Sequence, residues 1–177
     1  FGRGLVPRDL ATQGPGMVGA KPADIPLIPR SEWSARIKEG NETKSFLSHI
    51  RRRGDNGRPI PSLDQNGQGY CWFYGVTAAV MLLRAKANQP YVRLSGHSGA
   101  CKIKGFKDEG GWGALGLDFV KQYGIAPVDE WPEKSMNRSN DRPETWAAAS
   151  KFRVSEDWMD LESPVYDRDL TFDQVMT

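Results

Sequence analysis

The chain has 177 residues, of which 38% are hydrophobic and 26% are charged, and its formal net charge is +2. This length is sufficient for one domain with a hydrophobic core, or for one domain and part of another. The small net charge argues against nucleic-acid binding, and no segment approaches the roughly 18 consecutive apolar residues of a membrane span. Nineteen glycines and twelve prolines predict long irregular segments around a compact part.

Residues 1–30 are rich in proline and glycine. Proline removes a backbone donor and glycine raises the entropy cost of ordering, so this composition predicts an extended arm that builds no core of its own. Two interpretations remain open. The arm is either a disordered tail or a segment that lies along its own domain or along other protein subunits, as a propeptide or an assembly arm does.

Residues 31–60 predict a helical lead-in to the following domain. Ser31–Glu39 begins after a proline with a capping serine, and its two apolar side chains are four residues apart, as in a short helix. Glu42–Arg53 predicts a second helix, in which His49 is expected to be half-exposed. Gly54 is a plausible end for this helix, because glycine readily adopts the backbone conformation of a helix terminus.

Residues 61–177 are expected to form one domain, organised around the stretch from Gln65 to Ala87. Here a polar, glycine-rich loop passes into an apolar run that predicts a buried helix, with Cys71 at the junction. The face expected to be buried comprises Val76, Ala79, Val80 and Leu83. A helix N-terminus favours a thiolate, which is the nucleophilic form of cysteine. Cys71 is therefore a candidate nucleophile, although a free cysteine can also be an inert buried thiol.

Several later segments carry secondary-structure signals. Helices are predicted over Ser98–Lys104 and over Pro143–Ala149. Tyr91–Leu94 is expected to form a short strand-like or extended segment, and a short strand is expected at Phe152–Val154. A capping box at Thr171–Gln174 opens a further helix close to Thr177, and we expect that the natural polypeptide continues beyond it.

The central stretch and the one after it carry a family resemblance. Gln65, then five residues, then Cys71-Trp72 are followed by Leu94-Ser95 and by Gly110-Gly111-Trp112, which leads to Tyr123-Gly124-Ile125. In order and spacing, these stretches resemble the N-terminal half of papain-like cysteine proteases, peptidase family C1. The resemblance implies that Cys71 is the nucleophile and that Gln65 helps to form the oxyanion hole. It also implies that Gly110 and Gly111 bind the substrate backbone and that Trp112 lines a neighbouring pocket.

The resemblance also implies a fold of the α+β class. In a papain-like fold, this chain would supply mainly the helical left-hand domain, with a long central helix that starts at Cys71. The β-barrel half, which carries the catalytic His and Asn, is expected beyond Thr177. Gln68 stands where the family has one cysteine of a disulfide. Cys101, at the place of the other cysteine, is therefore expected to be unpaired.

Neither histidine fits the position of the missing base. His49 precedes Cys71, whereas the family's histidine follows the cysteine by about 130–150 residues. His97 follows Cys71 too closely, and a polar surface or capping role is expected for it. The two cysteines and two histidines lack the spacing of metal ligands, so neither a metal nor another cofactor is predicted.

Three functions remain open at this stage. The first is a papain-like cysteine peptidase that hydrolyses a peptide or protein substrate through an acyl-enzyme, with its histidine supplied by further sequence or by another chain. The second is a catalytically silent papain-like assembly protein, for example a virion component, and the third is another cysteine-dependent acyl transferase. The simpler alternatives to the functional roles are that Gln65 is only a polar loop residue and that Gly110-Gly111 is only a turn before a helix. Low cysteine use and the lack of a signal-peptide pattern favour a soluble cytoplasmic or virion protein.

Overall fold

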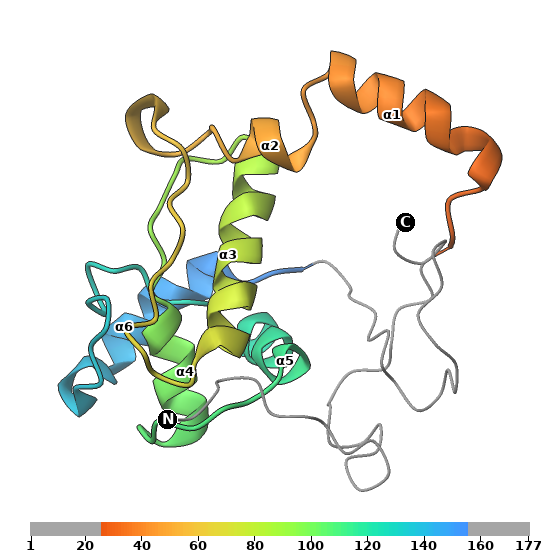
Figure 1. The fold of residues 1–177 in the computed structure, drawn as a ribbon. Helices are drawn as coiled ribbons and strands as arrows, with labels where there is room; N and C mark the ends of the chain where they lie inside the picture. Colours follow the sequence, from red (N-terminus) through yellow and green to blue (C-terminus); the bar gives the residue numbers. More distant parts are fainter. Residues whose placement is uncertain (1–25, 156–177) are drawn as a thin grey trace, which may run out of the picture.

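The computed structural model describes residues 26–155, in which helices are joined by irregular loops (Figure 1). The α-helices are α1 (Trp33–Glu42), α2 (Leu47–Ile50), α3 (Cys71–Lys86), α4 (Gly96–Lys104), α5 (Gly113–Tyr123) and α6 (Pro143–Ala149). Short 3-10 helices are η2 (Arg30–Glu32), η3 (Asp55–Gly57), η4 (Arg138–Asn140) and η5 (Ser150–Phe152). Most of the predicted arm and the predicted capping box at Thr171–Gln174 lie outside the described residues. Within residues 26–155 no helix is long and apolar enough to cross a bilayer.

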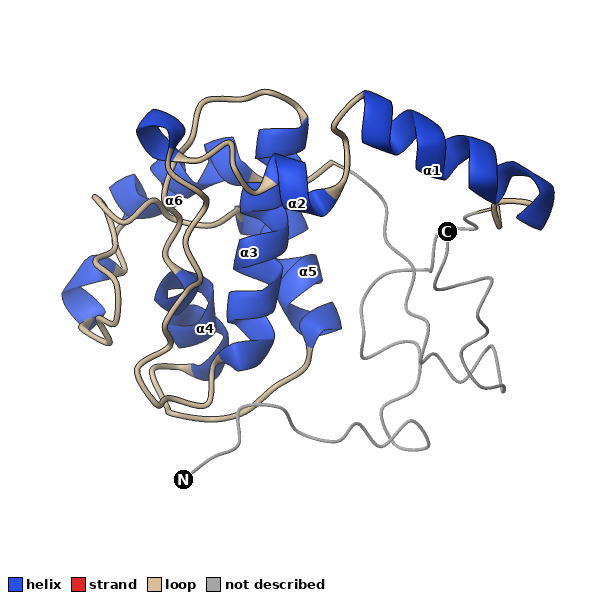
Figure 2. Cartoon of the chain, turned by 45° about the horizontal axis from the view of Figure 1, so that its top comes forward, coloured by secondary structure: helices blue, strands red, loops and turns tan. Residues whose placement is uncertain are grey.

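Helix α3 is the central element of the helical body. Helices α4 and α5 pack against it, and α2 lies near its C-terminal end (Figure 1). Helix α1 projects away from this body in both views (Figure 2). Because α2, α4 and α5 all contact α3, the orientation of α3 decides which of its side chains face the core and which face outward.

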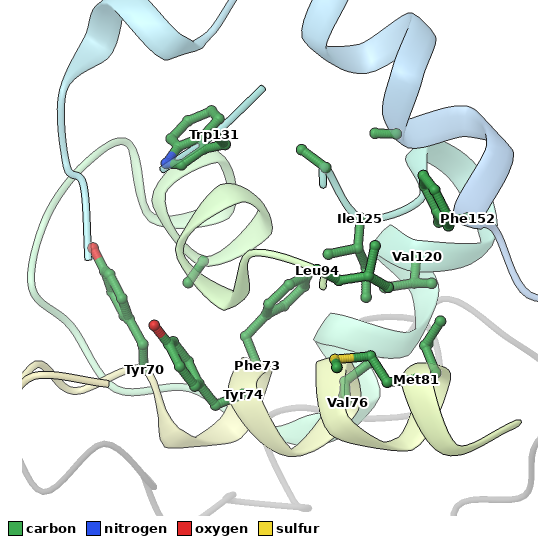
Figure 3. Close-up of a cluster of buried hydrophobic side chains, with 14 of the residues drawn as sticks. Tyr70, Phe73, Tyr74, Val76, Met81, Leu94, Val120, Ile125, Trp131 and Phe152 are labelled. Atoms are coloured by element: carbon green, nitrogen blue, oxygen red, sulfur yellow. The ribbon is translucent and has the colours of Figure 1, made fainter. Parts of the chain in front are cut away.

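The hydrophobic core lies on the inner side of α3. Figure 3 shows side chains of α3 together with those that α4, α5 and the following loops bring against them. The fully buried large side chains include Tyr70, Phe73, Leu94, Val120, Ile125 and Trp131. Burying one such apolar side chain stabilises the fold by about 1.5–3 kcal/mol, so this cluster is the main source of stability.

Close packing between these helices depends on glycines that face aromatic rings. A Cβ atom on Gly99 of α4 would lie 2.0 Å from Cζ of Phe73, and one on Gly96 would lie 2.6 Å from Cδ2 of Tyr74. On α5, a Cβ atom on Gly116 would lie 3.2 Å from Cδ2 of Phe73. The missing side chains allow the backbones of α4 and α5 to approach the ring of Phe73 directly.

The expected α+β fold class is wrong for the described residues, which form helices and loops without a strand (Figure 2). At the expected strand Tyr91–Leu94, only an isolated bridge pairs Leu94 with Pro127. Proline has no N–H to extend a ladder, and α4 begins two residues after Leu94. The other expected strand, Phe152–Val154, begins inside η5 and continues as irregular chain.

The helix predictions agree with the structure in most places. Helix α3 begins at Cys71 as expected, and α6 has the predicted bounds. The predicted helix over Glu42–Arg53 is reduced to the single turn of α2, because Lys44 adopts a positive φ of 52° and ends α1. The predicted face of α3 is correct at Val76 and Val80, which are buried. It is wrong at Ala79 and Leu83, which are exposed.

We predict that Gly99→Ala destabilises the protein by about 1–3 kcal/mol, because the added methyl group collides with the buried ring of Phe73. Gly75→Ala is the matched control, since nothing lies within 4 Å of a Cβ at this exposed position inside α3. It should raise the free energy of unfolding by about 0.5–1 kcal/mol. Urea unfolding measures both changes. Equal midpoints for Gly99→Ala and the natural protein would contradict the packing described.

Candidate functional site

Cys71 is the first residue of α3, and its side chain is half-buried. The carbonyl oxygen of Tyr70 accepts hydrogen bonds from the backbone N–H groups of Phe73 (2.9 Å) and Tyr74 (3.0 Å). Within the described residues, the N–H groups of Cys71 and Trp72 have no such partner. Unpaired N–H groups and the positive end of the helix dipole both stabilise a negative charge at this point. The thiol of Cys71 therefore lies where an oxyanion would be stabilised.

The loop before α3 turns sharply and places Gln65 near the start of the helix. Asn66 and Gly67 have positive φ values of 58° and 75°, and the N–H of Gln68 donates to the carbonyl of Gln65 at 3.3 Å. Two successive residues of positive φ are typical of a type I′ turn, for which Asn-Gly is the favoured sequence. The polar, glycine-rich character of the loop thus has a local structural cause.

Gln65 and Cys71 line the same cavity, which has a volume of about 420 Å³. Its walls are α2, the segment that leads into the turn and the outer side of α3. The residues of this Cys71 cavity are Leu47, Arg51, Ile60, Pro61, Ser62, Leu63, Gln65, Cys71, Tyr74, Gly75, Ala78 and Leu82. The cavity is mainly apolar, and it has a nucleophilic side chain and an amide at one end. Such a combination can hold an extended peptide against a thiol.

Gly110, Gly111 and Trp112 lie beside the same loop but do not line the Cys71 cavity. A Cβ atom on Gly111 would lie 2.7 Å from the Trp72 ring, and one on Gly69 would lie 3.3 Å from the backbone nitrogen of Gly110. The N–H of Gly69 also donates to Asp108 at 2.6 Å. The glycine pair thus packs against residues on both sides of Cys71 in the sequence. Trp112 immediately precedes α5, near the ammonium group of Lys104.

His97 is fully buried, so the expected surface position is wrong. Its Nδ1 lies 2.5 Å from the hydroxyl of Tyr74, and its Nε2 lies 2.5 Å from Oε1 of Gln68. Because an amide oxygen only accepts, Nε2 carries the proton and the Tyr74 hydroxyl donates to Nδ1. Burial lowers the pKa of His97, which favours this neutral form. Both ring nitrogens are occupied, and neither is paired with Cys71.

Cys101 and His49 are the remaining cysteine and histidine of the sequence. Cys101 is a free, fully buried cysteine, which confirms that the two cysteines are not paired. Burial raises the pKa of Cys101 to about 11, so its thiol stays protonated. His49 is half-exposed, as predicted, on α2 near the opposite end of α3 from Cys71 (Figure 1). No cluster of three metal-ligating side chains occurs in residues 26–155.

Sequence reasoning missed two features of the site. The first is the hydrogen-bonded group of Tyr74, His97 and Gln68, whose members come from separate segments and give no local signal. The second is the outer stripe of α3 that lines the cavity. Cys71, Gly75, Ala78 and Leu82 follow a spacing of three to four residues, and reading the helical period from Cys71 would have found them.

No family model matches this chain, and neither a curated protein nor a solved structure is significantly similar to it. The likeness to papain-like proteases therefore rests on the motifs alone.

We predict that the stability of the protein falls as the pH is lowered from 7 to 5, and that His97 causes part of this fall. The folded state holds His97 below its ordinary pKa of 6.5. The unfolded state therefore binds more protons as the pH falls through this value, which favours unfolding. His97→Phe should cost about 1–3 kcal/mol at pH 7, because the buried Tyr74 hydroxyl and the half-buried Gln68 amide lose their partner.

Urea unfolding at pH 7 and pH 5 measures this effect. The free energy of unfolding should differ less between pH 7 and pH 5 in His97→Phe than in the natural protein. An equal difference in both proteins would mean that His97 takes up a proton as readily in the folded state as in the unfolded state, which would contradict the burial described.

Proposed function

We propose that this chain supplies the nucleophilic half of a papain-like cysteine peptidase, which hydrolyses peptide bonds through an acyl-enzyme. One observation carries the proposal. Cys71, at the N-terminus of a sixteen-residue helix, and Gln65, in the preceding turn, line one largely apolar cavity. The sequence motif alone singles out these two residues, and their convergence on one cavity supports the assignment.

The proposed reaction is an acyl transfer in two steps. The sulfur of Cys71 attacks the peptide carbonyl carbon, and the resulting oxyanion accepts hydrogen bonds from the Gln65 amide and the Cys71 backbone N–H. Collapse of this intermediate breaks the C–N bond, and the amine leaves with an added proton. Water then cleaves the thioester, which releases the acid and restores the thiol.

The proton transfers require a base, which neither histidine of this sequence provides. His97 is buried with both ring nitrogens hydrogen-bonded, and His49 lies on α2, near the opposite end of α3 from Cys71. The proposal therefore includes an imidazole supplied by other polypeptide. General acid-base catalysis contributes about 10²–10⁴ in rate, so the described residues alone would be a poor catalyst.

The lack of a base for Cys71 in the described residues favours a second candidate function, a catalytically silent assembly module. The described residues contain no cysteine–histidine pair, and a protein that only packs against neighbours needs none. The two candidates differ in whether Cys71 reacts with a peptide-like electrophile faster than an ordinary exposed thiol does.

The first test is covalent labelling of the natural protein with a peptidyl vinyl sulfone, followed by intact-mass measurement. A peptidase should gain one label, and Cys71→Ala should abolish the labelling. Cys101→Ala is the matched control and should still be labelled, because the thiol of Cys101 is fully buried. If the natural protein reacts with iodoacetamide at Cys71 but not with the peptidyl probe, the silent module is favoured.

A second test concerns the oxyanion hole. Gln65→Ala should lower the rate constant for labelling, or kcat/KM where turnover is seen, by about 10²–10³, the usual cost of one oxyanion donor. Gln89→Ala, at an exposed position after α3, should leave the rate unchanged. A loss below about threefold in Gln65→Ala would mean that Gln65 is only a polar loop residue.

A further inference from the structure

A second hollow, with a volume of about 150 Å³, lies at the C-terminal end of α3. Its walls are the last turns of α3, the residues just after that helix, and the segment that begins in η5. It shares no lining residue with the Cys71 cavity. Along the axis of α3, Arg84 in this hollow lies roughly 20 Å from Cys71. The hollow is therefore separate from the candidate active site.

The charged lining of this hollow is entirely basic, and we call it the basic hollow. Arg84, Lys151 and Arg153 line it, whereas no aspartate or glutamate of the described residues does. The ion pairs formed within residues 26–155 include none of these three cations. The amide side chain of Gln89 adds hydrogen-bonding capacity at the same place. Because neighbouring cations repel one another, a bound anion would be favoured here.

Arg84 is held in place by the groups around it. Its Nη2 donates to the carbonyl of Pro90 at 3.2 Å, and its Cζ lies 4.7 Å from the centre of the Phe152 ring. Its buried Nε has no hydrogen-bond partner within the described residues. Burial lowers the pKa of Arg84, and no carboxylate in that part of the chain opposes the effect. A guanidinium that is already positioned, and still charged, is suited to binding the oxygens of an anion.

Capping of α3 does not account for these cations. Basic side chains are favoured near a helix C-terminus, where carbonyl groups are left without partners. Here the carbonyls of Leu83, Arg84 and Ala85 already accept backbone N–H groups. Lys151 and Arg153 come from a different segment, and neither side chain has a hydrogen-bond partner among residues 26–155. Their positive charges are therefore available to a ligand.

Charge and shape indicate which kind of anion fits. A carboxylate or a phosphodiester carries a single negative charge, whereas a phosphate monoester carries about −1.5 to −2 at pH 7. Three cations match the doubly charged group best. Val80, Leu83 and Val154 line the same hollow, and Leu83 is 41% exposed. They offer apolar contact to a carbon group, and the volume is several times the roughly 30 Å³ of one water in the liquid.

We propose that the basic hollow binds a small organic phosphate monoester. Its phosphate pairs with Arg84, Lys151 and Arg153, and its carbon group lies against Leu83. Binding makes and breaks no covalent bond. Because the basic hollow and the Cys71 cavity have no residue in common, the proposal does not rest on the proposed function.

Isothermal titration calorimetry of the full chain with three probes tests the ligand class. Phenyl phosphate should bind more tightly than inorganic phosphate, which lacks the apolar contact. Phenyl sulfate has the same shape but only one negative charge, and it should bind about tenfold more weakly than phenyl phosphate. Equal affinity for phenyl sulfate would overturn the proposal. Equal affinity for inorganic phosphate would identify the free ion as the ligand and overturn the organic part.

A double variant tests the location of the site. Lys151→Gln, Arg153→Gln should weaken the binding of phenyl phosphate about tenfold, since an exposed cation contributes up to about fivefold to such a pair. Both residues are exposed, so the fold should be retained. The matched control Lys38→Gln, Lys44→Gln removes two positive charges at α1, outside the basic hollow, and should bind as the natural protein does. Unchanged affinity in the first variant, or an equal loss in both, would overturn the proposal.

A third variant separates the apolar contact from the charges. Leu83→Ala should weaken phenyl phosphate about threefold and leave inorganic phosphate unchanged, because it removes partly exposed apolar surface alone. An unchanged affinity for phenyl phosphate would overturn the contact with Leu83. Failure of the peptidyl probe at Cys71 would leave all these results unaffected, since none of these measurements involves the thiol.

Discussion

The contact of the Phe73 ring with Gly99 and Gly116 is the constraint on which this structure depends. It draws α4 and α5 against one side of α3 and leaves the opposite side uncovered by them. Because a helix places residues 3.6 to a turn, burying Phe73, Val76 and Val80 turns Cys71, Gly75 and Ala78 outward. The packing of the core thus creates the wall of the Cys71 cavity. A larger residue at Gly99 would force the Phe73 ring to move, and one at Gly116 would crowd the same ring.

The hydrogen-bonded group of Tyr74, His97 and Gln68 links that core to the loop before α3. One neutral imidazole bridges the first turn of α3 and the turn that follows Gln65. Two further hydrogen bonds hold this loop. The N–H of Gly69 donates to the Asp108 carboxylate, and the hydroxyl of Tyr70 donates to the carbonyl of Lys107. These contacts fix the approach to Cys71. His97 therefore has a structural role in positioning this loop, and its burial explains why it is not available as the base for Cys71.

Local signals made α3 and α6 predictable from the sequence, whereas Gln65 was paired with Cys71 only by the resemblance of their motif to papain-like proteases. A glycine-rich turn before an apolar run, and a proline in the first turn of a short helix, need no distant partner to be recognised. The failures arose where distant partners decide. Tyr91–Leu94 has a strand-like composition, but Leu94 meets Pro127, which cannot continue a ladder. His97 looked like a surface residue because Tyr74 and Gln68, which satisfy its nitrogens, are 23 and 29 residues away in the chain.

Cys71 and Gln65 are proposed to act together on a carbonyl group, and a crystal structure of the full chain with a peptidyl aldehyde tests this proposal most directly. The aldehyde should form a hemithioacetal with the sulfur of Cys71. Its oxygen should accept hydrogen bonds from the Gln65 side chain and from the Cys71 backbone N–H, with the peptide lying in the Cys71 cavity. An adduct on Cys71 whose oxygen points away from Gln65, or an adduct elsewhere on the chain, would contradict a joint role for these two residues.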